Sequence, residues 1–253
     1  MRVLLSNDDG IHSKGLDALV QAFAGVAEVI VVAPDREQSA ASHAISLSRP
    51  LRIAEISPDR WSVDGTPTDC IYVALHHLLK DRRPDVVVSG INYGANLGDD
   101  VTYSGTVAAA MEGTLLGVPS IAVSLVSRDR FDFGPAAAFA RSLAGEVVAR
   151  GLPRGTLLNV NVPRDPPAGY AITRLGKRNY GSLVLENVDP RGRKYYWIGG
   201  TETPHDDLPG SDCNAVFDQG LISVTPLRLD MTEPELLPVL QGWTVPGFAP
   251  KQR

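Results

Sequence analysis

Short, continuously apolar runs alternate with helix-like segments over the first two-thirds of the chain. The apolar runs have the length and composition of buried strands, and they occupy residues 2–6, 28–35, 84–90, 119–125 and 156–163. Segments with apolar residues at helical spacing lie between them, at residues 15–25, 66–81, 105–117 and 135–150. Strands that are apolar on both faces and separated by helices indicate a parallel sheet covered on both sides. The sequence therefore predicts a doubly wound, Rossmann-like, mostly parallel α/β core over residues 1–165.

The pattern changes after Pro163, where a C-terminal extension over residues 166–253 begins. Short strand-like segments, which we expect to form a β-rich arm, follow at residues 170–176, 182–188 and 193–200. A helix at 212–220, a strand at 221–229 that returns to the core sheet, and a tail with a short helix complete the expected elements. We treat residues 1–253 as a single domain.

The predicted arm carries Tyr195, Tyr196 and Trp197. Aromatic side chains on a projecting arm are better suited to a subunit interface than to exposure to water. The arm is therefore expected to take part in oligomerisation.

Composition limits the classes of partner. The chain has 43% hydrophobic and 21% charged residues, which is typical of a globular protein, and its net charge is −5. That charge gives no basic surface for a nucleic-acid polymer or an anionic membrane, so a phosphate group would have to be attracted locally by a metal or by backbone dipoles. Two distant cysteines, Cys70 and Cys213, are interpreted as small buried residues in a reducing compartment. With no apparent signal or membrane-spanning segment, we expect a cytoplasmic location.

Two acidic residues, Asp8 and Asp9, end the first predicted strand. Adjacent carboxylates repel each other, and burying them without a partner is unfavourable. Viewed alone, they are equally well explained by an Asx turn in which Gly10 takes a positive φ. The alternative is a hard divalent cation between them, because Mg²⁺ and Mn²⁺ prefer carboxylate and other oxygen ligands.

Polar loops follow three of the predicted strands, at the sheet edge where open parallel sheets bind ligands. Ser39 lies in the second of these loops and Asn92 in the third. The ordinary role of Ser39 would be a hydroxyl hydrogen-bonded to neighbouring backbone, and that of Asn92 a helix or turn cap. Added to two carboxylates, their oxygens would complete a cation site with positions left for water and phosphate. Ser104, Gly105 and Thr106 open a small-residue helix whose first N–H groups suit an anion, although a simple N-cap explains the same residues.

Further polar residues lie near these loops. Asn96 is explained by a cap, while His12 and His43 are candidates for substrate contact. Asp99 and Asp100 are most simply solvated loop acids. No dinucleotide-binding or P-loop glycine pattern is present, which counts against an oxidoreductase or an ATP-binding protein.

With these loops assembled, the sequence resembles the SurE survival-protein family of metal-dependent nucleotidases. The matching stretches are "LLSNDDGIHSKGL", "VVAPDREQSAASHAIS", "VDGTPTDCI", "PDVVVSGINYGANLGDDVTYSGTVAAAMEG" and, more weakly, "ISVTPLRLD". They reach about residue 230, and the segment 166–210 matches only in outline.

The resemblance implies one divalent cation per subunit, Mg²⁺ or Mn²⁺, and a ligand set of Asp8, Asp9, Ser39 and Asn92. It also implies a phosphate site formed by Asn96, Ser104, Gly105 and Thr106. The implied activity is hydrolysis of nucleoside 5′- and 3′-monophosphates, with short polyphosphate as a further substrate. The implied assembly is a homodimer or homotetramer in which the arm is exchanged between subunits.

We expect a metal-activated water to attack phosphorus, with Asp8 and Asp9 as catalytic residues and Asp9 the better candidate to accept a proton. One alternative is an aspartyl-phosphate formed on Asp8, but enzymes of that kind use an Asp-x-Asp spacing and these acids are adjacent. Another alternative is a nucleotide-binding regulatory protein without turnover. Release of phosphate from nucleoside monophosphates would separate an enzyme from that last class.

Overall fold

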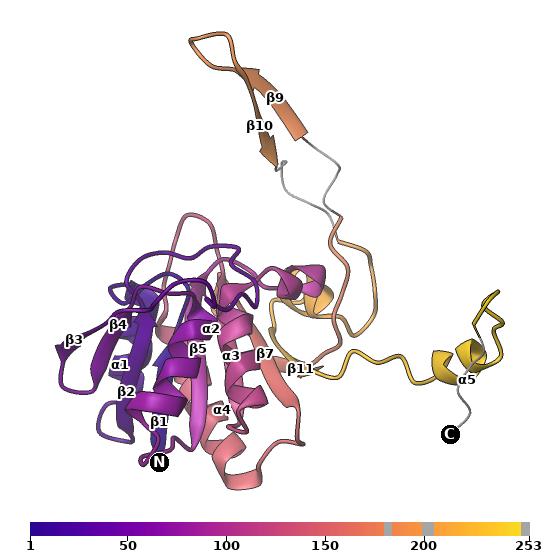
Figure 1. Cartoon of the computed structure of the whole chain (residues 1–253). Helices are drawn as coiled ribbons and strands as arrows, with labels where there is room; N and C mark the ends of the chain where they lie inside the picture. The colour runs from indigo at the N-terminus through magenta and orange to yellow at the C-terminus, as the bar shows by residue number, and fades with distance from the viewer. Residues whose placement is uncertain (180–183, 199–204, 249–253) are drawn as a thin grey trace.

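The computed structural model describes residues 1–179, 184–198 and 205–248, and a nine-stranded sheet runs through it (Figure 1). The strands, in sheet order, are β3 (Ile53–Ser57), β4 (Arg60–Val63), β2 (Glu28–Pro34), β1 (Arg2–Ser6), β5 (Val86–Tyr93), β6 (Ser120–Val126), β7 (Thr156–Pro163), β11 (Ile222–Arg228) and β8 (Tyr170–Ile172). The β3–β4 and β7–β11 pairs are antiparallel, and the remaining pairs of this sheet are parallel. The predicted mostly parallel α/β core is confirmed.

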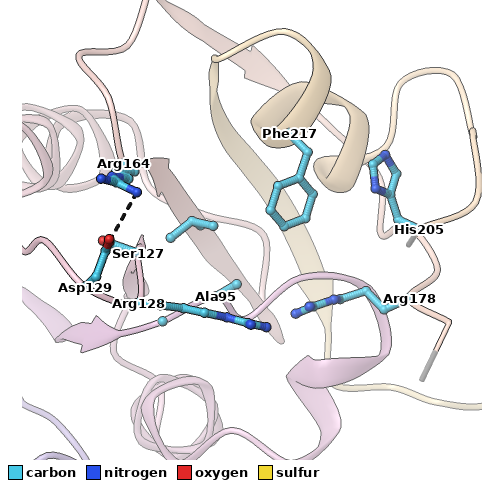
Figure 2. Close-up of a pocket in the computed structure, with 10 residues that line it drawn as sticks. Ala95, Ser127, Arg128, Asp129, Arg164, Arg178, His205 and Phe217 are labelled. Atoms are coloured by element: carbon cyan, nitrogen blue, oxygen red, sulfur yellow. Dashed lines mark ion pairs between the residues drawn. The ribbon is translucent and has the colours of Figure 1, made fainter. Parts of the chain in front are cut away.

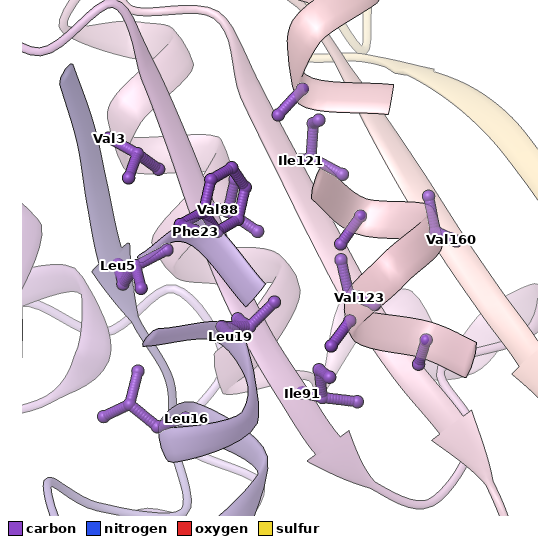
Figure 3. Close-up of a cluster of buried hydrophobic side chains, with 14 of the residues drawn as sticks. Val3, Leu5, Leu16, Leu19, Phe23, Val88, Ile91, Ile121, Val123 and Val160 are labelled. Carbon is purple, nitrogen blue, oxygen red and sulfur yellow. The ribbon is translucent and has the colours of Figure 1, made fainter. Parts of the chain in front are cut away.

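Helices cover both faces of this sheet. Their bounds are α1 (Lys14–Phe23), α2 (Pro67–Val73), α3 (Gly105–Leu115) and α4 (Gly134–Arg150). Side chains alternate between the faces of a strand, so Val3 and Leu5 of β1 pack with α1 and α4, whereas Leu4 packs with α2 and α3. Figure 3 shows the cluster on the α1–α4 face. This double burial explains why the strands are continuously apolar.

The sheet has a switch point at β1, which lies between β2 and β5. Ser6 of β1 pairs with Ser89 of β5, so the segments that follow these two strands leave the sheet side by side. Gly15 allows α1 to begin against β5, because a Cβ at this position would lie 2.1 Å from the carbonyl oxygen of Ile91. Ligands of open α/β sheets bind at such switch points, beyond the carboxyl ends of the strands.

The C-terminal extension adds two strands to the central sheet. β11 returns beside β7, as predicted. β8 pairs in parallel with β11 at the edge of the sheet, so the expectation that residues 170–176 belong to the arm is wrong. The composition of these residues predicts a strand, but the partner is set by the edge of β11, which lies about fifty residues further along the chain.

Because β11 is antiparallel to β7, its first residues lie at the same sheet edge as the carboxyl ends of β5, β6 and β7. The predicted helix at 212–220 is confirmed in a shorter form, the π-helix η3 (Asn214–Asp218), placed just before β11. Two other short helical segments are the π-helix η1 (Ala74–Leu78), which continues α2, and the 3-10 helix η2 (Gly98–Thr102). The extension therefore reaches the edge at which the polar loops meet.

The remaining arm is a hairpin of β9 (Val184–Val188) and β10 (Lys194–Ile198), which stands away from the sheet (Figure 1). The two predicted strands extend into residues 182–183 and 199–200, which lie outside the described residues. Every residue of β9 and β10 is exposed.

The tail contains the short helix α5 (Leu236–Gln241), and its end at 249–253 again lies outside the described residues. Cys70 and Cys213 are buried and unbridged, as predicted. In the described part of the chain, the helices are too short or too polar to cross a membrane.

Candidate active site

The turn after β1 is held by the side chain of Asn7. Its Nδ2 donates to the carbonyl oxygen of Gly10 at 3.0 Å and to Oγ of Ser13 at 2.7 Å. Ser13 in turn caps α1 by accepting the N–H of Leu16. Gly10 has φ +96°, a value that disfavours a side chain, so its predicted role in turning the chain is confirmed. These contacts fix the two acids between β1 and α1.

Asp8 faces the beginning of α3. Its Oδ1 accepts a hydrogen bond from Oγ1 of Thr106, and the residue is only 7% exposed. A Cβ on Gly105 would lie 2.9 Å from Oδ2 of Asp8, so glycine is what lets the helix approach this closely. Burial raises the pKa of Asp8, although hydrogen bonds from Thr106 and from its own backbone oppose the rise.

Asp9 is partly buried beside it. Burial, together with the negative charge of Asp8, raises the pKa of Asp9 to about 7, while a hydrogen bond from the backbone of Tyr93 opposes the rise. Its Oδ2 is buried and accepts no hydrogen bond from the described residues, and the same holds for Oδ1 of Asn7. A buried and a partly buried carboxylate side by side, with an unsatisfied oxygen atom on Asp9, fit a bound cation, which would offset both the repulsion and the missing hydrogen bond.

Ser39 and Asn92 lie at this sheet edge, but their side chains also have protein partners. Oγ of Ser39 donates to Oε1 of Glu37 at 2.5 Å, and the N–H of Gln38 donates to the carbonyl oxygen of Asp8 at 2.7 Å, which holds their loop against β1. At the end of β5, Nδ2 of Asn92 donates to a carbonyl oxygen two residues later at 3.0 Å, so its side-chain oxygen is the atom suited to a cation.

The donor chemistry at this edge selects the kind of cation. No three His, Cys, Asp or Glu side chains gather anywhere in the described ranges. A cation held here would therefore need neutral oxygen atoms besides the two carboxylates. That donor set suits Mg²⁺ or Mn²⁺ rather than Zn²⁺.

The predicted helix start at Ser104 is confirmed. Ser104 is the N-cap of α3, and its Oγ accepts the N–H of Val107 at 3.0 Å. Ser42 fastens the Ser39 loop to this helix start, because its N–H donates to the carbonyl oxygen of Tyr103 at 3.1 Å and its Oγ to that of Thr102 at 2.7 Å. The first turn of α3 thus lies against Asp8 and the Ser39 loop.

Asn96 is held by polar side chains of β6 and β7 that sequence reasoning missed. Its Nδ2 donates to Oγ of Ser124 at 2.8 Å, its N–H donates to Oδ1 of Asn161 at 2.8 Å, and its carbonyl oxygen accepts from Asn159 and Asn161. Both asparagines are fully buried. The two asparagines alternate with apolar residues in the segment "TLLNVNVP". Because buried polar side chains need hydrogen-bond partners, this alternation was a signal that the strand holds a polar loop in place as well as packing in the core.

The two candidate histidines lie in different surroundings. His12 is exposed. His43 bonds through Nε2 to Oε2 of Glu112 at 2.9 Å, and Glu112 is a buried residue of α3. The expectation that Asp100 is a solvated acid is wrong, because Arg178 pairs with it at 2.5 Å and both side chains are largely buried. The sequence could not show that a residue so much later in the chain crosses over to it.

Comparisons with known proteins agree with this architecture. Residues 3–182 match the family model described as "Survival protein SurE". The chain is 62% identical over 248 residues to a Myxococcus xanthus protein named 5′-nucleotidase SurE, with 98% of this chain and 95% of that one covered. A Citrifermentans bemidjiense protein of the same name is 54% identical, with 97% and 100% covered. The crystal structure of the SurE protein from Aquifex aeolicus superposes with a TM-score of 0.85 at 40% identity, covering 95% of this chain and 98% of that one. The chain therefore belongs to the SurE family.

Proposed function

We propose that this chain is a metal-dependent nucleotidase that hydrolyses nucleoside 5′- and 3′-monophosphates to nucleoside and phosphate, with short polyphosphate as a further substrate. The observation that carries the proposal is the pair of carboxylates, Asp8 and Asp9, held side by side at the start of α3 with raised pKa values. The relatives named 5′-nucleotidase, at 62% and 54% identity, support the same reaction.

Asp8, Asp9, Ser39 and Asn92 would hold one divalent cation per subunit, Mg²⁺ or Mn²⁺. When bound, such a cation supplies charge to the phosphoryl oxygens and lowers the pKa of a water molecule. The fit rests on the buried, unsatisfied Oδ2 of Asp9 and on a donor set made of oxygen atoms.

The chain's own residues then have separate tasks. Thr106 fixes the orientation of Asp8 through its hydroxyl. Asp9, whose Oδ2 accepts no hydrogen bond from the described residues, is the better candidate of the two acids to accept a proton from the attacking water. The N–H groups at the beginning of α3, near Ser104 and Gly105, are suited to stabilise the equatorial phosphoryl oxygens, because a helix leaves its first N–H groups without partners within the helix.

The test is phosphate release from a panel of 5′- and 3′-monophosphates and polyphosphate after exhaustive chelation. We expect no turnover in chelator and recovery on adding Mn²⁺ or Mg²⁺. Full activity after chelation would overturn the metal site. Tight nucleotide binding without phosphate release would identify a regulatory protein instead.

We further propose that the chain assembles as a homodimer or homotetramer through the β9–β10 hairpin. Its two strands expose apolar side chains that a monomer would leave in water, including Leu185 at 49%, Trp197 at 64% and Ile198 at 90% exposed. Sedimentation at micromolar concentration tests this, and Trp197→Glu with Ile198→Glu is expected to yield monomers. A wild-type monomer would count against the arm as an interface. A cytoplasmic location stays a prediction of the sequence.

A further inference from the structure

A pocket of about 590 Å³ adjoins the candidate active site (Figure 2). Gly94 and Ala95, which lie between the predicted ligand Asn92 and the predicted phosphate residue Asn96, form part of its wall. The loops after β6 and β7, the segments that carry Arg178 and His205, and the short helix η3 form the rest. Its volume lies within the roughly 300–1,000 Å³ typical of small-molecule pockets. Nothing in the proposed phosphoryl chemistry uses it.

One wall of the pocket is aromatic. The ring of Phe217, on η3, stacks on the ring of His205 with centroids 5.4 Å apart and planes inclined by 28°. Phe217 is 45% exposed, so part of its ring remains open to a ligand. The guanidinium carbon of Arg178 lies 6.0 Å from the centre of the same ring. Flat aromatic ligands stack on such rings and on guanidinium planes.

The charges of the pocket argue against a polyanion as its occupant. Arginines line it at positions 128, 164 and 178, and the side chains of Arg128 and Arg178 point toward each other (Figure 2). Arg164 pairs with Asp129 at 3.2 Å, and Arg178 pairs with Asp100 at 2.5 Å. Much of the positive charge is thus already balanced. A guanidinium group carries five N–H donors, and several such groups beside an aromatic face suit a neutral ring with acceptor atoms on its edge.

We propose that this pocket binds the nucleoside part of the substrate, with its base stacked on Phe217 and the edge of the base bonded by arginine N–H groups. The assignment rests on the proposed nucleotidase function, because it needs a phosphate held at the neighbouring site. It gives the chain a means to recognise the nucleoside, which the residues proposed for phosphoryl transfer do not contact.

The test compares a nucleotide with a phosphomonoester that has no base. Phe217→Ala and Phe217→Tyr are assayed for phosphate release from AMP, GMP and ribose 5-phosphate with Mn²⁺, together with inhibition of ribose 5-phosphate turnover by free adenosine and guanosine. Loss of a stacked base corresponds to roughly a 5- to 100-fold rise in KM for the nucleotides. For Phe217→Ala we expect that rise, unchanged ribose 5-phosphate kinetics and weakened inhibition by nucleosides. Phe217→Tyr, which keeps the ring, should resemble the wild type.

A matched control is Tyr170→Ala, which removes another exposed aromatic ring, one that lies tilted against Phe139 outside the pocket. It should leave the KM of all three substrates unchanged. Unchanged nucleotide KM in Phe217→Ala, or equal losses on nucleotide and ribose 5-phosphate, would overturn the pocket assignment and leave the proposed function standing. A wild-type protein that hydrolyses none of the substrates with Mn²⁺ would overturn the proposed function and the pocket with it.

Discussion

Replacing Asp9 with asparagine should make the metal-free protein more stable at neutral and alkaline pH. The carboxyl of Asp9 has its pKa raised from 3.8 to about 7 in the folded chain. Between these two pH values the folded state keeps a proton that the unfolded state releases. The free energy of unfolding therefore falls as the pH rises from about 4 to about 7, and above about 7 this loss of stability is complete. The amide that replaces this carboxyl in the variant cannot ionise, and the penalty disappears.

The size of the effect follows from the shift. About three pKa units at ~1.4 kcal/mol each set a ceiling of ~4 kcal/mol. Because Asp9 is only partly buried, solvent screening reduces this, and we expect about 2 kcal/mol at pH 8. For a chain of this length, that corresponds to a rise of roughly 5 °C in Tm. The pKa of Asp8 is also raised, so its ionisation likewise destabilises the fold at neutral pH. Asp9→Asn removes the neighbouring negative charge and so reduces the repulsion on Asp8 as well.

The assay is urea or thermal unfolding in EDTA at intervals from pH 4 to pH 8.5. The matched control is Asp81→Asn, which neutralises an exposed loop acid and should follow the wild-type pH profile. Adding Mn²⁺ should stabilise the wild type more than Asp9→Asn, because ligand binding to the folded state adds stability that grows with affinity. If Asp9→Asn is less stable than the wild type in EDTA at pH 8, or if the two profiles are parallel, the account of this acid pair is wrong.

Three other substitutions test the surroundings of the pair. Asp8→Asn should lower turnover by two or more orders of magnitude while keeping the fold, since it removes a charged ligand and relieves repulsion; near-normal turnover would contradict the metal site. Thr106→Val removes the hydroxyl that orients Asp8, and calorimetry should show roughly 10- to 100-fold weaker Mn²⁺ binding, with Thr106→Ser close to the wild type. Gly105→Ala introduces a Cβ 2.8 Å from that of Asp8 and should cost about 1–3 kcal/mol in urea unfolding, whereas Gly145→Ala, where a Cβ meets nothing within 4 Å, should not destabilise.

The core of this fold follows from patterns that are local in sequence. Each buried strand is a run of apolar residues, and the helix caps at Ser13 and Ser104 stand directly before the segments they begin. The positive φ of Gly10 was also predictable, because glycine after two acids is typical of a tight turn. These features need no knowledge of distant contacts.

What the sequence could not show depends on pairings between distant residues. β8 has the composition of an arm strand, and its partner is known only once β11 has returned to the sheet. Asp100 looks like a solvated acid until Arg178 is brought to it. The nucleoside pocket was missed for the same reason, because Phe217 and Arg128 carry no motif and meet only through the reversal of β11.

The antiparallel direction of β11 has a consequence for how such a protein can diversify. The groups proposed for phosphoryl transfer all lie between residues 8 and 106, whereas Phe217 and His205 of the pocket come from the last fifth of the chain. One strand run in reverse brings these two regions to the same sheet edge. Substitutions near η3 can therefore alter which nucleotide is bound without disturbing Asp8 and Asp9. The substrate range and the rate of phosphoryl transfer can then evolve independently.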